Sequence, residues 1–264
     1  MNDMKILVFV KQVPNSDDVK LDPKTGNLRR EGVESIMNPL DAHAIEAALQ
    51  LKAKHGGTVT AISMGPSQAA DVLRKALALG CDEAVLLSDR AFGGADTLAT
   101  SYTLAMAARK LGDFDLLLFG RNATDGDTAQ TGPATAAQLD IPQISFADSI
   151  DIEDGWVCCT REFDGMCERV RAKLPALVTV CREANTPRYP TPIGIMKSAR
   201  KPITVWDAAE LGADTARTGM PGSPSATKKV FEPERVNMDT RFLDGSPEDI
   251  AVQLADVLEA EHLL

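Results

Sequence analysis

Short apolar runs alternate with longer segments that carry a helical apolar stripe, and this order constrains the fold of the chain most strongly. The predicted strands span residues 5–12, 58–64, 84–87 and 115–119. The predicted helices span residues 39–54 and 67–79, and a third runs from Asp96 or Thr97 to near Gly112. The alternation predicts an α/β fold of three layers, with a parallel sheet between two layers of helices.

Residues at the ends of the predicted helices agree with this assignment. Asn38 suits the N-cap position, Pro39 suits the first turn, and Gly80 suits a left-handed helix stop. Right-handed crossovers bring the carboxyl ends of parallel strands to one edge of the sheet. We therefore expect a ligand in the crevice at that edge, where the strand order reverses.

One loop at this edge has the composition of a phosphate cradle. Residues 120–133 read GRNATDGDTAQTGP, between the apolar run 116–119 and a small-residue helix predicted at 134–139. Backbone N–H groups and the positive helix end favour an anion there. Each hydrogen bond to a charged group contributes roughly 1.5–3 kcal/mol, and the helix dipole adds about 0.3–1 kcal/mol. Such donors can hold a diphosphate without a lysine.

Asp125 and Asp127 within this loop have two interpretations. They could form a metal pair or serve as general bases, or they could hold the loop through hydrogen bonds to its backbone. We favour the second, because carboxylates repel a phosphate unless Arg121 or a cation compensates.

The predicted helix start at residues 96–101 is a second candidate anion site. Thr97 and Thr100 are three residues apart and therefore share a face of the first turn. Their hydroxyls and the free N–H groups of the turn could bind a phosphate. The alternative is plain capping of the helix by Asp96 or Thr97, and the segment alone slightly favours it.

The pattern changes to hairpins after residue 145. Residues 146–152, 156–162 and 169–173 alternate in polarity and are separated by Asp-Gly pairs at 154–155 and 164–165. They predict antiparallel strands that extend the sheet. Residues 177–181 form a further apolar strand.

After Asn185 prolines become frequent and the apolar residues have no long period. A disordered tail is one interpretation, but Tyr189 and Trp206 favour an extended arm. Residues 246–249 carry a helix-cap signature, followed by an apolar stripe over 250–258. We expect an α/β domain over residues 1–184 and an arm over 185–264 that docks on another protein.

Composition excludes several classes of function. The net charge of −10 argues against nucleic acid or an anionic membrane as the main partner, although residues 197–201 form a basic patch. No segment approaches the length of a membrane span. The five cysteines form no C-x-x-C pair, which predicts reduced thiols in a cytoplasmic protein without a metal site.

The side chains offer no catalytic constellation. His43, His55 and His262 match no metal-ligand spacing. The sequence has no G-x-S-x-G elbow, no Walker motif and no G-x-G-x-x-G fingerprint. We therefore expect a binding site without catalytic residues of its own.

Seven short motifs resemble, in their order along the chain, the beta (small) subunit of electron-transfer flavoproteins. They are VKQVP at 10–14, MNPLD at 37–41, MGP at 64–66, the loop 120–133, KLPA at 173–176, NTPRY at 185–189 and IMK at 195–197. The resemblance covers nearly the whole chain. It implies a fold like that of the adenine-nucleotide hydrolases, a nucleotide in the predicted crevice, and an obligate alpha subunit that carries one FAD.

The resemblance also implies which residues line the nucleotide and which meet a partner. The expected cofactor-binding residues are Phe9, Asn38, Pro39, Leu40, Asp41, Met64, Gly65, Asp96, Thr97, Thr100, Gly120, Arg121, Asn122, Ala123, Thr124, Asp125, Gly126, Asp127, Thr128, Ala129, Gln130 and Thr131. Residues 183–201 resemble the loop that recognises acyl-CoA dehydrogenases, and the arm is expected to wrap the alpha subunit. The expected recognition residues are Tyr189, Pro192, Ile193, Ile195, Met196 and Lys197, with Ile193 in place of a family leucine that aligns with Pro192.

The family has two branches, which differ in the ligand of the crevice. One branch holds a structural AMP. The other holds a second FAD and bifurcates electrons from NADH, one to the alpha-subunit FAD and a dehydrogenase, the other to ferredoxin or flavodoxin. The small residues of 124–130 and the helix start at 96–100 resemble the second branch. The alternatives are an AMP-holding carrier, a stand-alone nucleotide-binding stress protein of the same fold, and a nucleotide hydrolase that depends on Asp125 and Asp127.

Overall fold

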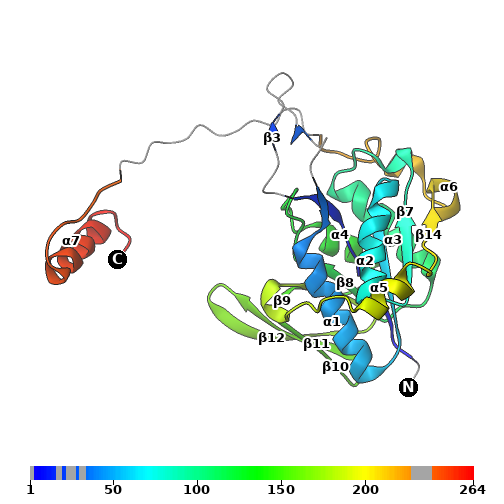
Figure 1. The fold of residues 1–264 in the computed structure, drawn as a ribbon, viewed down its shortest axis with the longest axis horizontal. Coiled ribbons are helices and arrows are strands. Elements are labelled where there is room, and N and C mark those ends of the chain that lie inside the picture. The colour runs from blue at the N-terminus through cyan, green and yellow to red at the C-terminus, as the bar shows by residue number, and fades with distance from the viewer. Residues whose placement is uncertain (1–2, 16–19, 22–27, 30–33, 227–239) are drawn as a thin grey trace. The chain divides into compact units, whose positions relative to one another are not determined.

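Seven parallel strands form the centre of the larger of two units into which the chain divides, residues 1–229 and 230–264 (Figure 1). The computed structural model describes residues 3–15, 20–21, 28–29, 34–226 and 240–264. In spatial order the strands are β14 (Thr204–Trp206), β7 (Glu83–Leu87), β6 (Thr58–Met64), β1 (Lys5–Phe9), β8 (Leu116–Gly120), β13 (Ala176–Val180) and β9 (Gln143–Ala147). The predicted parallel sheet is therefore confirmed.

Helices cover both faces of this sheet, as predicted. Odd and even residues of β1 divide between two apolar clusters, because side chains of a strand alternate between its faces. Ile6 and Val8 pack with α1 (Pro39–His55) and α2 (Ala70–Leu79), and α5 (Pro192–Ser198) lies against α2. Leu7 and Phe9 pack with α3 (Thr97–Leu111), α4 (Thr131–Leu139) and α6 (Ala208–Leu211).

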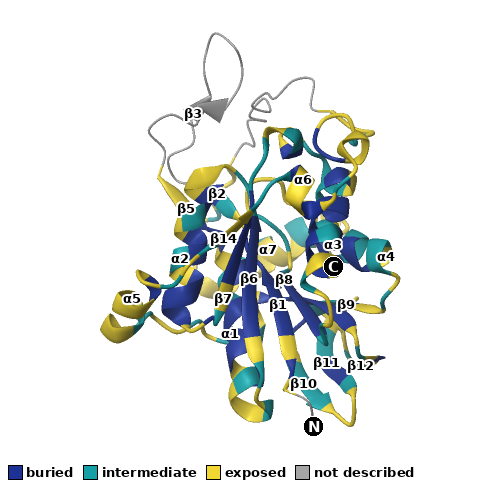
Figure 2. Cartoon of the chain, turned by 90° about the vertical axis from the view of Figure 1, so that its right-hand side faces the viewer, coloured by how far each residue is buried: buried dark blue, intermediate teal, exposed yellow. Residues whose placement is uncertain are grey.

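Burial on both faces explains the continuous apolar runs of the central strands. All residues of β8 except Gly120 are buried, and so are all residues of β1 after Lys5. Figure 2 shows the central strands as the most deeply buried part of the cartoon. Such runs are typical of parallel sheets with helices on both sides.

Short elements complete the connections. β2 (Gln12–Pro14) pairs antiparallel with β5 (Ser35–Met37), and β3 (Lys20–Leu21) pairs with β4 (Leu28–Arg29). In the part of the chain that the structure describes, 3₁₀ turns occur at η2 (Ser67–Ala69), η3 (Arg90–Phe92), η4 (Arg182–Ala184) and η5 (Thr215–Arg217). Within the described residues, no helix combines the length and the apolar character needed to cross a bilayer.

The predicted hairpins are present, but the expectation that they extend the central sheet is wrong. β10 (Ser149–Glu153), β11 (Trp156–Phe163) and β12 (Met166–Lys173) form a separate antiparallel sheet. The residues predicted as one strand, 146–152, divide between β9 and β10, because the chain leaves the parallel sheet after Ala147. The separate sheet is held by apolar residues such as Val157 and Cys159, which pack into the same cluster as α1.

Residues beyond Asn185 contribute to the α/β unit. β14 pairs with β7 at one edge of the sheet, and Ala208 and Leu211 of α6 are buried. The structure therefore divides the chain after Lys229, whereas the sequence placed the division after residue 184. In the second unit, α7 (Pro247–Ala260) begins with a capping box between Ser246 and Asp249, as the sequence predicted.

Candidate functional site

The strand order reverses beside β1. The chain passes from β1 to β6 and β7 on one side, then crosses back through α3 to β8 on the other side of β1. A cavity of about 840 Å³ lies at the carboxyl ends of β1, β6 and β8. This is the position at which doubly wound sheets bind their ligands.

Most of the expected cofactor-binding residues line this cavity. Phe9, Asp41, Met64, Gly65, Asp96, Thr97 and Thr100 line it, and so do Gly120, Arg121, Asn122, Ala123, Asp125, Gly126, Asp127, Thr128, Ala129, Gln130 and Thr131. The lining does not include Asn38, Pro39, Leu40 and Thr124. Segments distant in sequence therefore meet at one site.

Several lining residues were not singled out from the sequence. They include Lys11, Ile62, Phe92, Leu104, Phe119 and Ser225. Phe119 and Ile62 lie at or near the carboxyl ends of predicted strands, so the alternation of side chains along a strand could have identified them. Ser225 had no such signal, because its place depends on a long-range contact with Asp96.

Two stacked aromatic rings form part of the apolar wall of the cavity. Phe9 of β1 and Phe119 of β8 are register partners, with ring centroids 4.3 Å apart and planes inclined by 11°. Ile62 and Leu104 belong to the same apolar cluster and also line the cavity. The wall is suited to contact a flat apolar ring system.

Asn38 occupies the N-cap position of α1, as predicted, but its side chain holds the loop 120–131. Its side chain makes no cap hydrogen bond. Its Nδ2 donates to the carbonyl oxygen of Asn122 at 2.9 Å, and its Oδ1 accepts from the backbone N–H of Thr124 at 3.2 Å. Because Asn38 is fully buried, it supports the loop from behind the cavity wall.

Both carboxylates of the loop have partners within the protein. Lys11 Nζ donates to both oxygens of Asp125, at 2.7 and 2.8 Å. Asn122 Nδ2 donates to Asp127, whose backbone is left-handed with φ of 46°. The guanidinium of Arg121 instead lies over the ring of Phe146, 4.8 Å from its centroid. Lys11, which the sequence reasoning missed, therefore supplies the cation beside Asp125.

A buried carboxylate joins the two loops on either side of the strand reversal. Asp41 accepts the backbone N–H of Lys11 at 2.7 Å. Burial raises the pKa of Asp41 to about 7, against the lowering effect of Asn38 and of the backbone N–H groups of Lys11 and Gly120. A Cβ atom on Gly120 would lie 2.4 Å from Asp41 Oδ1 and 2.7 Å from the carbonyl carbon of Leu40. Glycine at 120 is therefore what permits the close approach of α1 to β8.

Three helices begin beside the cavity, and they differ in their caps. α1 carries Asp41 in its first turn. The carboxylate of Asp96 accepts from the N–H groups of Leu98 and Ala99 at the start of α3, and also from Ser225. α4 begins after Gln130, whose side chain makes no cap hydrogen bond. Of these three, the start of α4 is the one where free N–H groups are not matched by a carboxylate.

The residues expected to meet a partner lie away from this cavity, on and before α5. Tyr189 is 91% exposed, and Ile193, Ile195 and Met196 are each at least half exposed. Pro192 and Lys197 are also exposed. Thr191 caps α5 through the N–H of Gly194 at 3.0 Å. The structure thus presents these side chains as one exposed, largely apolar group.

A second polar cluster lies outside the cavity. Oxygen and sulfur atoms of Asp148, Cys181 and Glu183 lie within 4.8 Å of one another. Burial and the nearby Asp148 raise the pKa of the Cys181 thiol to about 11. The thiol is therefore protonated near neutral pH and is a weak nucleophile.

The sheet order, the two helical layers and the cavity at the reversal point define a doubly wound α/β protein. A sequence profile of the electron transfer flavoprotein domain matches residues 25–211. The chain belongs to the electron transfer flavoprotein family, as its motifs predicted.

Relatives from several bacteria align with almost the full chain. Subunit CarD of the caffeyl-CoA reductase-Etf complex of Acetobacterium woodii is 44% identical over 262 residues, 99% of this chain and 100% of that protein. The electron transfer flavoprotein subunit beta of Megasphaera elsdenii is 44% identical over 270 residues, with the same coverage. Protein FixA of Azorhizobium caulinodans is 39% identical over 261 residues, 94% of this chain and 92% of that protein.

Proposed function

We propose that the chain is the beta subunit of a heterodimeric electron-transfer flavoprotein, with FAD in the cavity at the strand reversal. The cavity carries this proposal. Its volume of about 840 Å³ lies toward the upper end of the range of roughly 300–1,000 Å³ for ligand pockets. FAD needs more room than AMP, because a flavin and ribityl chain are added to the adenosine half.

The lining residues fit both halves of such a ligand. The stacked Phe9 and Phe119 provide an apolar wall for a planar ring. Thr97 and Thr100 at the start of α3, and Thr128 and Thr131 at the start of α4, provide hydroxyl donors for a diphosphate. The positive end of α4 favours the same negative charge.

FAD, when bound, supplies the redox chemistry, since it exchanges electrons in pairs or singly. The residues of the chain bind and orient it and exclude water. This division of roles agrees with the lack of an acid-base constellation in the sequence. We place the chain in the bifurcating branch, which takes electrons from NADH and delivers them both to ferredoxin or flavodoxin and to the FAD of the alpha subunit.

The second proposed partner is a flavoenzyme of the acyl-CoA dehydrogenase type, which would contact the exposed group around Tyr189 and α5. The name of the Acetobacterium woodii relative assigns that protein to a complex with a reductase of a CoA ester. Exposed apolar side chains on a preformed surface are typical of such contacts.

Cofactor analysis of the complex purified with its alpha subunit tests the proposal. Two FAD per heterodimer and no AMP are expected, together with NADH-driven reduction of ferredoxin or flavodoxin. One FAD and one AMP would instead assign the chain to the carrier branch with structural AMP. No adenine nucleotide would refute the site altogether.

The hydroxyls of Thr97 and Thr100 allow a sharper test of the same cavity. The double change Thr97→Val and Thr100→Val keeps shape but removes both donors, and it should reduce FAD retention in this subunit by tenfold or more, since each bond to a charged group contributes roughly 1.5–3 kcal/mol. Leu98→Ala changes the same turn outside the cavity lining and serves as the matched control. Equal FAD retention in both variants would contradict the assignment.

A further inference from the structure

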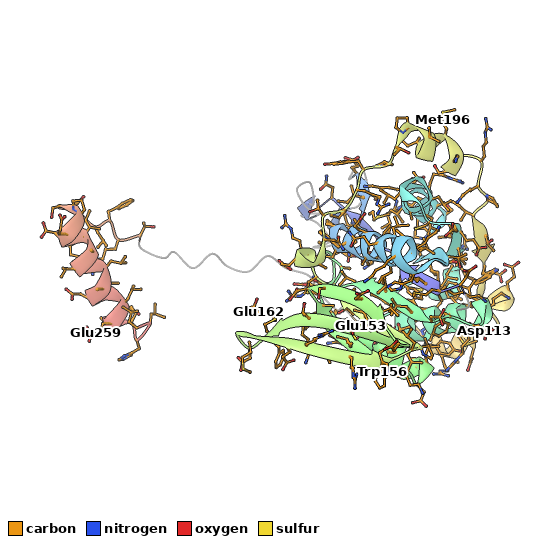
Figure 3. All side chains as sticks on the ribbon, turned by 90° about the horizontal axis from the view of Figure 1, so that it is seen from below. Asp113, Glu153, Trp156, Glu162, Met196 and Glu259 are labelled. Carbon is orange, nitrogen blue, oxygen red and sulfur yellow. The ribbon has the colours of Figure 1, made fainter. Side chains whose placement is uncertain are left out.

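The exposed group on α5 is carried by a segment that cannot hold its own shape. α5 has seven residues, whereas isolated helices shorter than about 12–15 residues are marginal in water. Tyr189 precedes it in a stretch without helix or strand and is 91% exposed. Figure 3 shows Met196 on α5 at the outer side of the α/β unit. Contacts with the rest of the unit must therefore fix the direction in which this segment points.

The strongest of these contacts is an ion pair between α1 and the residue before Tyr189. Arg188 Nε and Nη2 donate to the two oxygens of Glu46 at 2.7 and 3.0 Å. The backbone N–H of Arg188 also donates to Glu46, at 3.2 Å. Gln50 Nε2 donates to Glu46 at 3.0 Å from the next turn of α1. One carboxylate thus fixes both the side chain and the backbone at position 188.

Further contacts hold the two ends of the segment. His43 Nδ1 lies 3.0 Å from the carbonyl oxygen of Asn185, and Asn185 Nδ2 donates to the carbonyl oxygen of His43 at 3.0 Å. After α5, Arg74 donates to the carbonyl oxygens of Ser198 and Lys201. The segment is therefore anchored on both sides of its exposed residues.

Glu46 lies in a buried position, where an unpaired carboxylate would destabilise the folded protein. The residue is only 5% exposed. Burial acts to raise the pKa of Glu46, but the hydrogen bonds from Arg188 and Gln50 outweigh it and lower the pKa below its usual value. The Arg188 side chain is 45% exposed, and an ion pair with such a solvent-exposed partner adds little stability. What it provides is a fixed, bidentate geometry.

We infer that Glu46 is a positioning residue for partner recognition, which holds Arg188 so that Tyr189 and α5 face the partner in one orientation. The inference rests on the proposed function of this segment as the contact with a flavoenzyme of the acyl-CoA dehydrogenase type. Glu46 itself is buried beneath the segment and would act through Arg188. Its effect therefore falls on partner binding and leaves the cofactor site unchanged.

The test uses the full chain in complex with its alpha subunit. Glu46→Gln keeps the shape and removes the charge, and Arg188→Lys keeps the charge and removes the bidentate contact. Lys54→Met is the matched control, because it breaks another ion pair of α1, with Asp151 at 2.5 Å, away from the segment. Amide hydrogen exchange of residues 185–201, KM for the dehydrogenase, kcat and FAD content are measured for each variant.

Both Glu46→Gln and Arg188→Lys should speed exchange in residues 185–201 by about tenfold or more, the factor expected when a hydrogen bond to a charged group is lost. KM for the dehydrogenase should rise by a similar factor, with kcat and FAD content unchanged. Lys54→Met should leave all four quantities at the wild-type values. Exchange in residues 185–201 that stays at the wild-type rate in both variants would overturn the positioning role.

A further variant separates this role from the proposed function. Ile193→Ala removes an exposed side chain from α5 without touching the anchors. If exchange rises in Glu46→Gln but KM is unchanged in both Glu46→Gln and Ile193→Ala, the segment does not recognise the partner, and the proposal about the partner fails while the anchoring role stands.

Discussion

Gly120→Ala should destabilise the chain through a contact that has no room to relax. A Cβ atom at this position would lie 2.4 Å from Asp41 Oδ1, 2.7 Å from the carbonyl carbon of Leu40 and 2.8 Å from the backbone nitrogen of Asp41. Two of these atoms are backbone at the start of α1, so a side-chain rotation cannot remove the overlap. Either α1 or the end of β8 must move.

The cost can be estimated from the contacts. Overpacking of this kind costs about 1–3 kcal/mol. If the movement also breaks the hydrogen bond from the Lys11 N–H to Asp41 at 2.7 Å, roughly 0.5–1.5 kcal/mol more is lost. For chains of roughly this length, each kcal/mol lowers Tm by about 2–4 °C.

Gly126→Ala is the matched control within the same loop. No atom lies within 4 Å of a Cβ built there, so its free energy of unfolding should stay within about 0.5 kcal/mol of the wild type. The assay is urea denaturation of both variants, combined with FAD retention in the complex with the alpha subunit. Equal stability of the two variants would refute the close approach of α1 to β8 as the reason for a glycine at 120.

Three further predictions follow from the site and the fold. Folding raises the pKa of Asp41 from its usual 3.8 to about 7, so it favours the neutral acid, and the stability contributed below pH 3.8 is lost as the pH rises through 7. The free energy of unfolding of the wild type should therefore fall relative to that of Asp41→Asn between pH 3.8 and pH 7, and a constant difference between the two proteins would contradict the shift. Lys11→Met should weaken FAD retention by several-fold, because the substitution leaves Asp125 as an uncompensated negative charge beside a diphosphate. Adding Asp125→Asn to Lys11→Met should restore FAD retention. The dissociation constant of FAD measures both effects. Truncation after Lys229 should leave a cooperative thermal transition, whereas truncation after Asn185 should abolish it, because the latter removes β14 and the buried residues of α6; calorimetry of the two products distinguishes them.

Much of the fold could be predicted from local patterns. Strands of a parallel sheet are buried on both faces, so each one is visible in the sequence as a continuous apolar run. The strand over residues 58–64 and the helix that begins at Pro39 occur as expected. β14 could not be predicted, since its three residues have no periodic signal and two of them are exposed. Its place depends on pairing with β7, which is more than a hundred residues earlier in the chain.

The position of the cavity could be predicted from the sequence, but the side-chain contacts that shape it could not. The strand reversal and the glycine-rich loop indicated where a ligand would lie. The roles of Asn38 and Lys11 were not accessible, because each depends on a partner in the loop 120–131. Asparagine is a common helix-capping residue, yet the side chain of Asn38 is hydrogen-bonded to the loop 120–131. Local propensity cannot tell these two uses of an asparagine apart.

The helix α1 links the cavity proposed for FAD to the segment proposed to contact the redox partner, so protein engineering cannot treat the two separately. Asn38 directly before the helix and Asp41 in its first turn support the cavity loops, and Glu46 farther along the helix holds the segment before α5. Transplanting residues 185–201 from another family member, in order to change the redox partner, would therefore require a compatible α1 as well. The structure therefore favours designs in which α1 and residues 185–201 are exchanged together.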